Sequence, residues 1–144
     1  MPDFVAGPVA RRKKRKTKYL VMWKARIFED GTVSSDRILT FPGGMEHPAE
    51  HGDLEATYAE ELEEETGLKL RKGAKITLIP VTIKRPEHTK NFVRVWRRDC
   101  TGTLRKVSID DGTSRLYAPF YADKQYLEQH LHGDHREVLP FLED

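Results

Sequence analysis

The stretch that decides the fold of this 144-residue chain is FPGGMEHPAEHGDLEATYAEELEEETGL, residues 41–68. An extended segment runs into a Pro-Gly-Gly turn, and a polar loop then leads into an acidic segment. Asp53 is a suitable N-cap, apolar positions recur at helical spacing from Leu54, and Gly67 suits a left-handed stop. We therefore predict a helix between Asp53 and Gly67 that follows a strand and a glycine turn.

The C-terminal half of this helix places five carboxylates in six residues, 60–65. Like charges at i,i+3 and i,i+4 cost roughly 0.2–0.5 kcal/mol per pair, and the negative end of the helix dipole adds to that cost. Glu61, Glu64 and Glu65 share one arc of the helix, beside the arc expected to face the core. Hard cations such as Mg²⁺ or Mn²⁺ bind oxygen ligands of this kind and bridge them to phosphates. The alternative is a solvated acidic helix paired with Lys and Arg.

The glycines ahead of the helix allow the backbone to approach a metal or a phosphate more closely than a side chain would permit. Gly43-Gly44-Met45-Glu46 followed by residues 61–68 resembles the Nudix box, whose pattern is Gly, five residues, Glu, seven residues, then Arg-Glu-aliphatic-x-Glu-Glu-x-Gly-aliphatic. The matching positions are Glu61, Leu62, Glu64, Glu65, Gly67 and Leu68. The resemblance implies an α/β fold, a Nudix-like α/β/α sandwich with a mixed β-sheet.

The same resemblance implies a chemistry and a set of residues. Family members use Mg²⁺ or Mn²⁺ to cleave the pyrophosphate bond of a nucleoside diphosphate linked to another moiety. Carried over by position, the metal ligands would be Gly44 through its carbonyl, Glu61, Glu64 and Glu65, with Asp111 added from a later loop. Glu61 and Glu64 are the candidate catalytic acceptors of the proton from the attacking water. The alternative for Asp110-Asp111-Gly112 is a simple turn.

Two positions depart from the family pattern. Glu60 stands where the family has Arg, so the usual basic partner of the catalytic acids is replaced, and another cation would have to take its place. Gly52 stands where a Glu is expected, with Glu50 as a substitute in a longer loop. Three functions therefore remain open: a nucleotide pyrophosphohydrolase, a 5′-end RNA pyrophosphohydrolase, and a non-catalytic nucleotide or RNA sensor on the same fold.

Charge is segregated along the chain, although the formal net charge is only +2. It amounts to +6 over residues 1–44, −9 over 45–68, +10 over 69–109 and −5 over 110–144. This pattern indicates an anionic site rimmed by positive charge, which a metal and a phosphorylated ligand would satisfy. The run Arg11–Lys16, in a basic turn or arm at 11–18, would contact phosphate or RNA, or stay solvated. Arg94, Trp96 and Arg98 share one side of a predicted strand and are candidate substrate-binding residues, the alternative being an exposed strand face.

The remaining sequence predicts a single domain over residues 1–144. No apolar run approaches the ~20 residues of a membrane-spanning helix, and the single cysteine, Cys100, cannot close an internal disulfide. We therefore expect a cytoplasmic protein without a membrane segment. His130, His132 and His135 form a short tract that is weak evidence for a metal site.

Strand patterns of β-branched and aromatic residues recur along the chain. We expect an edge strand over 3–10 and a short helix over 123–131 that Gly133 ends, with a last turn opened by Asp134. Further strands are expected over residues 19–28, 38–41, 75–85, 92–98 and 115–121. Strands mixed with two or three helices, without strict alternation, predict an α+β or mixed α/β layered domain.

Overall fold

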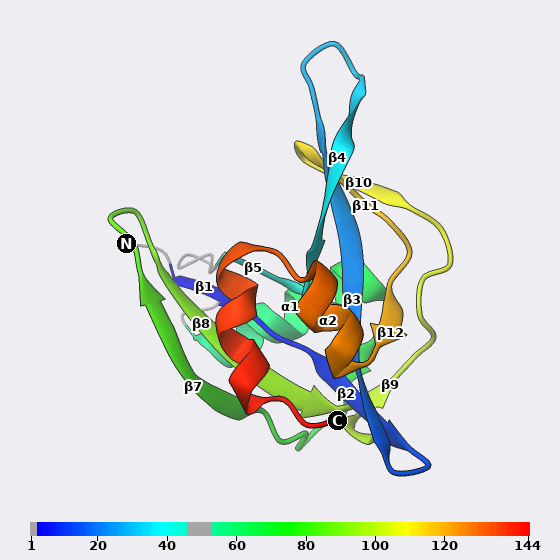
Figure 1. Cartoon of the computed structure of the whole chain (residues 1–144), viewed down its shortest axis with the longest axis vertical. Helices are drawn as coiled ribbons and strands as arrows, with labels where there is room; N and C mark the ends of the chain where they lie inside the picture. Colours follow the sequence, from blue (N-terminus) through cyan, green and yellow to red (C-terminus); the bar gives the residue numbers. More distant parts are fainter. Residues whose placement is uncertain (1–2, 46–52) are drawn as a thin grey trace.

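The computed structural model describes residues 3–45 and 53–144 of the chain. Its elements follow one another as shown in Figure 1. The strands and helices are β1 (Asp3–Ala6), β2 (Val9–Lys13), β3 (Lys16–Ile27), β4 (Val33–Thr40), β5 (Gly43–Met45), α1 (Leu54–Thr66), β6 (Lys69–Leu70), β7 (Thr77–Lys84), β8 (Thr89–Trp96), β9 (Cys100–Thr101), β10 (Ile109–Asp111), β11 (Ser114–Leu116), β12 (Phe120–Ala122) and α2 (Lys124–His130), with 3₁₀ segments at Arg97–Asp99 and Gly133–Phe141.

The main sheet is mixed, with the order β10-β11-β3-β2-β8-β1-β5. β1 and β2 both run parallel to β8, whereas β2 pairs antiparallel with β3, and β1 pairs antiparallel with β5. β4 and β12 also pair with β3, and β7 pairs with β8. This arrangement places the glycine strand β5 at the end of the order, beside β1.

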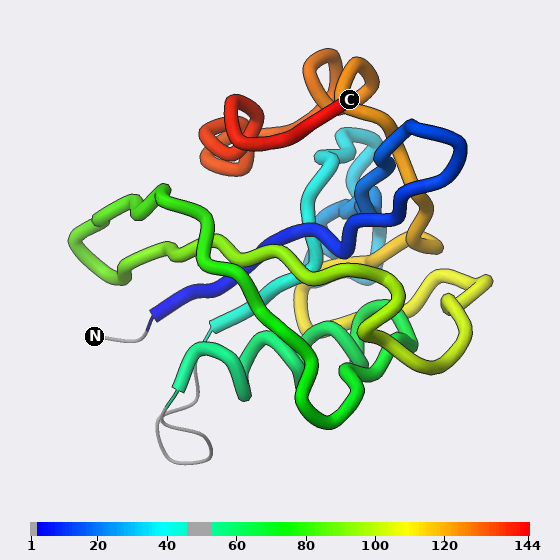
Figure 2. The backbone as a smooth tube through the Cα atoms, turned by 90° about the horizontal axis from the view of Figure 1, so that it is seen from below, coloured from blue at the N-terminus to red at the C-terminus, as the bar shows by residue number. Residues whose placement is uncertain are grey.

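Helices cover both faces of the sheet, as Figure 2 shows. On one face, α1 buries Tyr58 and Leu62 against Val5, Val9 and Val95 of the sheet. On the other face, α2 and the final 3₁₀ segment contribute the buried residues Leu127, Val138 and Leu139, which pack with Ala6, Ala10 and Phe92. Successive strand residues alternate between these two clusters, because side chains along a strand point to opposite faces. The result is a three-layered α/β/α sandwich.

Helix α1 begins and ends where the sequence predicts. The Asp53 carboxylate accepts a hydrogen bond from the Ala56 N–H at 2.6 Å, and Gly67 adopts φ 87° as its N–H donates to the Glu63 carbonyl. An N-cap oxygen and a left-handed glycine satisfy backbone groups that a helix terminus leaves without partners. The acidic helix is therefore held in a defined register relative to the sheet.

The structure corrects four expected elements. The segment 3–10 is not an edge strand, because Gly7-Pro8 divides it into β1 and β2, each of which pairs on both sides. The strand expected over 92–98 ends at Trp96 and continues as a 3₁₀ turn. The strand expected over 115–121 is two short strands, β11 and β12, separated by residues 117–119.

The last correction concerns the C-terminus. Asp123 does cap α2, but the helix ends at His130, and the final 3₁₀ segment begins at Gly133 and extends to Phe141. No helix in the described ranges is long and apolar enough to cross a membrane.

Candidate active site

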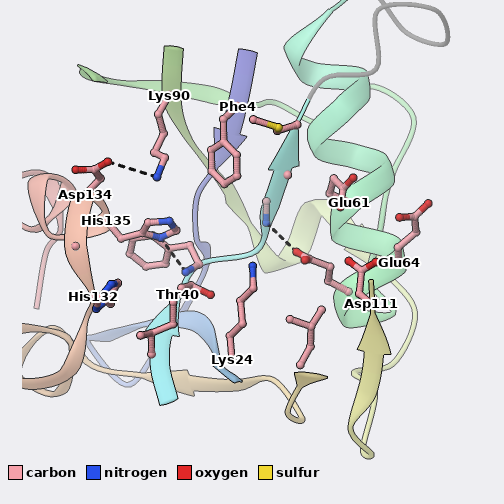
Figure 3. A pocket seen from close by; sticks show the side chains of 18 residues that line it. Phe4, Lys24, Thr40, Glu61, Glu64, Lys90, Asp111, His132, Asp134 and His135 are labelled. Atoms are coloured by element: carbon pink, nitrogen blue, oxygen red, sulfur yellow. Dashed lines mark hydrogen bonds and ion pairs between the residues drawn. The ribbon is translucent and has the colours of Figure 1, made fainter. Parts of the chain in front are cut away.

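A pocket of about 610 Å³ opens between the C-terminal half of α1 and the final 3₁₀ segment. Figure 3 shows its residues. Glu61, Glu64 and Glu65 line one end of it, as their shared arc on the helix predicts. Tyr58 and Leu62 occupy the neighbouring arc and are fully buried. The helix thus anchors its apolar side in the core and turns three carboxylates toward the pocket.

The glycine strand β5 lies against these carboxylates. A Cβ atom on Gly44 would come within 2.5 Å of the Glu61 Cδ and 2.7 Å of its Oε2. The Gly43 N–H donates a hydrogen bond of 2.9 Å to Glu65 Oε1. A side chain at position 44 would displace the Glu61 carboxylate from its position here, and Gly43 and Gly44 both line the pocket.

Glu65 is the buried member of the acidic group, with only 7% of its surface exposed. Burial raises the pKa of its carboxyl to about 8, and the nearby Glu61 and Asp111 carboxylates raise it as well. The Gly43 N–H and the Lys24 ammonium act in the opposite direction. A carboxyl in this position gains its charge at neutral pH when a cation compensates it.

The donor set suits a hard divalent cation, because every candidate ligand atom is an oxygen. Within residues 3–45 and 53–144, no three Asp, Glu, His or Cys side chains stand as a ready-made metal site. Mg²⁺ characteristically keeps several waters and combines one or two carboxylates with substrate phosphates. The oxygens that line the acidic end would supply part of the coordination of such a cation, and water and substrate phosphates would supply the rest.

The hairpin formed by β10 and β11 brings one further carboxylate to the acidic end. Asp111 lines the pocket beside Glu64. Asp110 instead points to Arg115, whose guanidinium donates hydrogen bonds of 2.7 and 3.2 Å and lowers the pKa of the Asp110 carboxyl. The two residues are thus both part of a hairpin, and only the second one faces the pocket.

Two cations stand beside the acidic helix end. Lys24 of β3 lines the pocket and acts electrostatically on Glu65. Arg105 donates from Nε to the Glu65 carbonyl at 2.9 Å, and its backbone N–H donates to the Thr66 carbonyl at 2.8 Å. Cationic donors at a helix C-terminus offset the partial negative charge of the dipole. Sequence reasoning expected a cation here without identifying it, because both residues are distant from the helix along the chain.

No family model matches the chain, and no curated protein matches it. Solved structures do match it. A MutT Nudix hydrolase from Burkholderia pseudomallei aligns with a TM-score of 0.68 at 18% identity, covering 99% of this chain and 98% of that one. The Nudix domain of Shewanella oneidensis NrtR, complexed with ADP ribose, gives 0.66 at 14%, covering 95% and 82%. The Caenorhabditis elegans Ap4A hydrolase gives 0.54 at 10%, covering 98% and 94%.

The chain has the Nudix fold. This confirms the layered architecture with a mixed sheet that the box-like motif predicted. In this chain, residues 43–45 of the box-like motif form β5 and residues 61–66 form the last turns of α1. Gly67 caps the helix, and Glu61, Glu64 and Glu65 line the pocket beside β5. Glu60, which replaces the arginine of the Nudix box, does not line that pocket and faces a separate hollow beside Lys69. Glu50 and Gly52 lie outside the described residues.

The end of the pocket opposite the acidic group was not predicted from the sequence. Lys90 of β8 lies 3.5 Å from Asp134, and its ammonium stands 4.8 Å from the centre of the Phe4 ring. His135 is buried, and its Nδ1 accepts a hydrogen bond from the Phe41 N–H at 3.1 Å. Burial lowers the pKa of His135 to about 3, with Lys90 contributing in the same direction. This imidazole is therefore neutral at physiological pH.

The three histidines of the C-terminal tract separate in the folded chain. His132 and His135 line the pocket that contains the acidic group. The centre of the His130 ring instead lies 4.4 Å from the centre of the Tyr126 ring. The sequence pointed to this end of the pocket only through the histidine tract and the turn expected at Asp134. Its approach to Lys90 could not be inferred, because strand β8 and the final 3₁₀ segment meet only in the tertiary structure.

The predicted substrate-binding residues Arg94, Trp96 and Arg98 do not line the pocket that contains the acidic group. Arg94 lies 3.6 Å from Glu143, and the guanidinium carbons of Arg94 and Arg98 stand 5.0 and 5.4 Å from the centre of the Trp96 ring. Arg98 belongs to the 3₁₀ turn after β8 rather than to the strand. The structure thus brings these three side chains together, at a distance from the carboxylates, and substrate contact by them stays a prediction.

Proposed function

We propose that this protein is a divalent-metal-dependent hydrolase that cleaves the pyrophosphate bond of a nucleoside diphosphate linked to another moiety. The observation that carries the proposal is the acidic end of the pocket, which Glu61, Glu64 and Glu65 line together. Glu61 lies against Gly44, and Glu65 accepts a hydrogen bond from Gly43. Repulsion between carboxylates at i,i+3 and i,i+4 near a helix C-terminus costs stability, and a bound cation would offset that cost. Their convergence in a pocket is explained by a cation and the phosphates that it binds.

The residues proposed to hold Mg²⁺ or Mn²⁺ are Glu61, Glu64, Glu65, Asp111 and the carbonyl of Gly44. When held by these residues, a divalent cation would supply charge neutralisation for the phosphates and a lower pKa for a water that it binds. Glu61 or Glu64 accepts the proton of the attacking water, because both carboxylates line the pocket. Glu65 is buried and hydrogen-bonded to Gly43, so we assign it to holding charge in place rather than to moving a proton.

The linked moiety is proposed to occupy the end of the pocket formed by Lys90, Asp134 and His135. Since His135 Nδ1 accepts the Phe41 N–H, the proton of this neutral ring is assigned to Nε2, which remains as a donor. Lys90 supplies a cation and Asp134 an acceptor. A pocket with an acidic end for a metal and a mixed polar end for an organic group supports cleavage between a phosphate and its substituent.

The proposal is tested by hydrolysis of nucleoside triphosphates, dinucleoside polyphosphates, nucleotide sugars and 5′-triphosphorylated or capped RNA with Mg²⁺ or Mn²⁺. We expect turnover on one class, its loss with EDTA, and a fall of about 10²–10⁴-fold in kcat for Glu64→Gln, the range for removing a general base. Glu63→Gln is the matched control, because Glu63 lies on the same helix, is exposed and does not line the pocket. Equal activity of the two variants would contradict the assignment.

Two alternatives on the same fold are separated by the same experiment. A non-catalytic nucleotide or RNA sensor, favoured by Glu60 in place of the box arginine, predicts ligand binding without turnover on any compound. A 5′-end RNA pyrophosphohydrolase, favoured by the basic run Arg11–Lys16, predicts turnover only on 5′-phosphorylated RNA. Contact of Arg94, Trp96 and Arg98 with substrate belongs to this second alternative, because an RNA would extend beyond the pocket. Cys100 is a free thiol, and we propose a reducing, cytoplasmic location.

A further inference from the structure

The basic run of the sequence forms a protruding β-hairpin. β2 and β3 pair antiparallel with Arg11 opposite Lys18 and Lys13 opposite Lys16. Lys14 and Arg15 connect the strands with φ values of 51° and 66°. A two-residue hairpin turn of type I′ requires positive φ at both positions and prefers Asn-Gly. The chain accepts backbone strain at this tip while placing two cations there.

One face of this hairpin, which we call the cationic face, carries only positive side chains. Arg11 and Lys13 on β2 stand directly opposite Lys18 and Lys16 on β3. All four are exposed, and with Lys14 they line a hollow of about 460 Å³. Like charges directly opposite one another in a sheet are destabilising by roughly 0.2–1 kcal/mol per pair. Within residues 3–45 and 53–144 no carboxylate forms an ion pair with any of these five side chains.

The opposite face of the same hairpin is different. Arg12 donates a hydrogen bond of 3.0 Å to the Thr17 hydroxyl and lies 3.9 Å from the Glu143 carboxylate. The C-terminal segment also satisfies Tyr19 there, since the Tyr19 hydroxyl donates to the Glu143 carbonyl at 2.9 Å. The fold thus compensates positive charge on one side of the hairpin with a carboxylate. On the cationic face, the Arg11 guanidinium lies over the Tyr121 ring, 4.3 Å from its centre, and the lysines are exposed.

We propose that the cationic face binds the phosphate backbone of a nucleic-acid strand. Cations two residues apart along each β-strand are separated by about 6.7 Å, a spacing comparable to that of successive phosphates. Binding would release counterions and relieve the repulsion between the two opposed pairs. The assignment does not depend on the proposed hydrolase, because the hairpin projects away from β5 and α1 in both Figures 1 and 2.

A nucleic acid suits this face better than a lipid surface does. Segments that bind membranes combine cations with large apolar side chains that enter the acyl boundary. In the described part of the chain, the large exposed apolar residues lie elsewhere; they are Phe28, Met45, Leu78, Val107 and Phe141. The hairpin tip consists of Lys14 and Arg15 and has nothing to insert into a bilayer.

The test is fluorescence anisotropy of a labelled oligouridylate and its deoxythymidylate counterpart, titrated with the full chain over about 50–200 mM salt. Each phosphate contact to a single strand contributes about 0.7 to the slope of log K against log salt. For Lys13→Gln/Lys16→Gln we therefore expect weaker binding and a slope reduced by about 1.4. Lys72→Gln/Lys75→Gln is the matched control, with the same charge change at two exposed lysines of another loop. It should keep the wild-type slope.

Three outcomes would overturn the proposal. They are no salt-dependent binding by the wild-type chain, an equal loss of slope in the control variant, and tighter Lys13- and Lys16-dependent binding to phosphatidylserine vesicles than to either oligonucleotide. The ratio of the affinities for the oligouridylate and the deoxythymidylate shows whether the face prefers RNA or DNA. Glu64→Gln should bind oligonucleotide as the wild type does, so a failure of the hydrolase proposal and a failure of this one are distinguishable.

Discussion

Two regions of this protein concentrate like charge, and the fold treats them in opposite ways. At the end of α1, the acidic side chains are met by donors and cations from distant segments: Gly43 donates to Glu65, Lys24 faces it, and Arg105 holds its carbonyl. On the cationic face of the hairpin, Lys13 and Lys16 stand opposite one another in solvent.

The difference separates a site built into the protein from a surface that awaits a partner. Within the acidic group, burial and the Gly43 hydrogen bond fix the position of Glu65, and the helix places Glu61 and Glu64 beside it, an arrangement that preorganises charge for a ligand. On the cationic face only Arg11 has a recorded neighbour among the described residues, the Tyr121 ring, so the lysine charges act through the ionic atmosphere and through flexible side chains. Substitutions in the first region should therefore change geometry and stability, whereas substitutions in the second should change mainly binding and its salt dependence.

The largest expected effect is the pH dependence contributed by Glu65. Its pKa in the folded chain is about 8, above the ordinary 4.5, so the folded state holds this proton more tightly than the unfolded state does. Its contribution is present in full below pH 4.5 and is lost as pH rises through about 8, a change on the order of 5 kcal/mol in the metal-free protein.

Urea unfolding in EDTA across this range measures that loss. Glu65→Gln should show a flatter profile, because a glutamine can accept the Gly43 N–H without titrating. His135 acts on the acid side, where its lowered pKa removes stability as pH falls from 6.5 toward 3. Because the two windows overlap, the difference between wild type and Glu65→Gln isolates Glu65. Identical profiles would show that the acidic end is not held by burial.

The next largest effect is expected at Arg105, which connects the end of α1 to other segments of the backbone. Its guanidinium donates to four backbone carbonyls, which are those of Glu65, Val107, Leu116 and Tyr117. Hydrogen bonds from a charged group contribute about 1.5–3 kcal/mol each and are not additive. We expect Arg105→Gln to lower the free energy of unfolding by about 3 kcal/mol. Arg71→Gln, which removes one exposed bond to the Arg98 carbonyl, is the control and should cost well under half as much.

The two glycines of β5 provide a matched pair. The Cβ of Gly44→Ala would meet the end of the flexible Glu61 side chain, whereas that of Gly43→Ala would meet the backbone of β1 at Val5 and Ala6. Gly44→Ala should displace the Glu61 carboxylate and reduce kcat by about 10²-fold, with the melting temperature nearly unchanged. Gly43→Ala should instead destabilise the fold by about 2 kcal/mol. The reverse pattern would refute a role for Glu61 in a preorganised site.

The smallest expected effect concerns the hairpin. Lys16→Glu would convert a repulsive cross-strand pair with Lys13 into an attractive one and raise stability by about 0.5 kcal/mol. The same substitution should weaken oligonucleotide binding and reduce its salt dependence, since it changes the charge of the face by as much as Lys13→Gln/Lys16→Gln does. Thermal unfolding and anisotropy measure the two consequences, and Lys72→Glu in an exposed loop controls for net charge. A variant that is less stable than the wild type would mean that the lysine pair is not a cost to the fold.

Local patterns were sufficient to predict α1, its caps, and the carboxylates that it turns to one side. Helical periodicity and capping depend on neighbours within a few residues, so Asp53, Gly67 and the arc of Glu61, Glu64 and Glu65 can be inferred from the sequence. The layered class with a mixed sheet followed from the Nudix-like motif. Segments interrupted by proline or glycine were predicted less well, since strand pairing decided whether residues 3–10 and 115–121 continued or broke.

Only the tertiary structure decided which side chains meet. Lys24, Arg105 and Asp111 reach the acidic end from β3, from the segment after β9 and from β10, while Lys90 and His135 form the opposite end from β8 and the final 3₁₀ segment. Arg94, Trp96 and Arg98 do cluster, but the pairing of β2 with β8 places them beside the hairpin. The chemical character of the acidic helix can be inferred from the order of its residues, because it depends on neighbours within the helix. The composition of the pocket depends on contacts between segments far apart along the chain, and these exist only once the sheet has assembled.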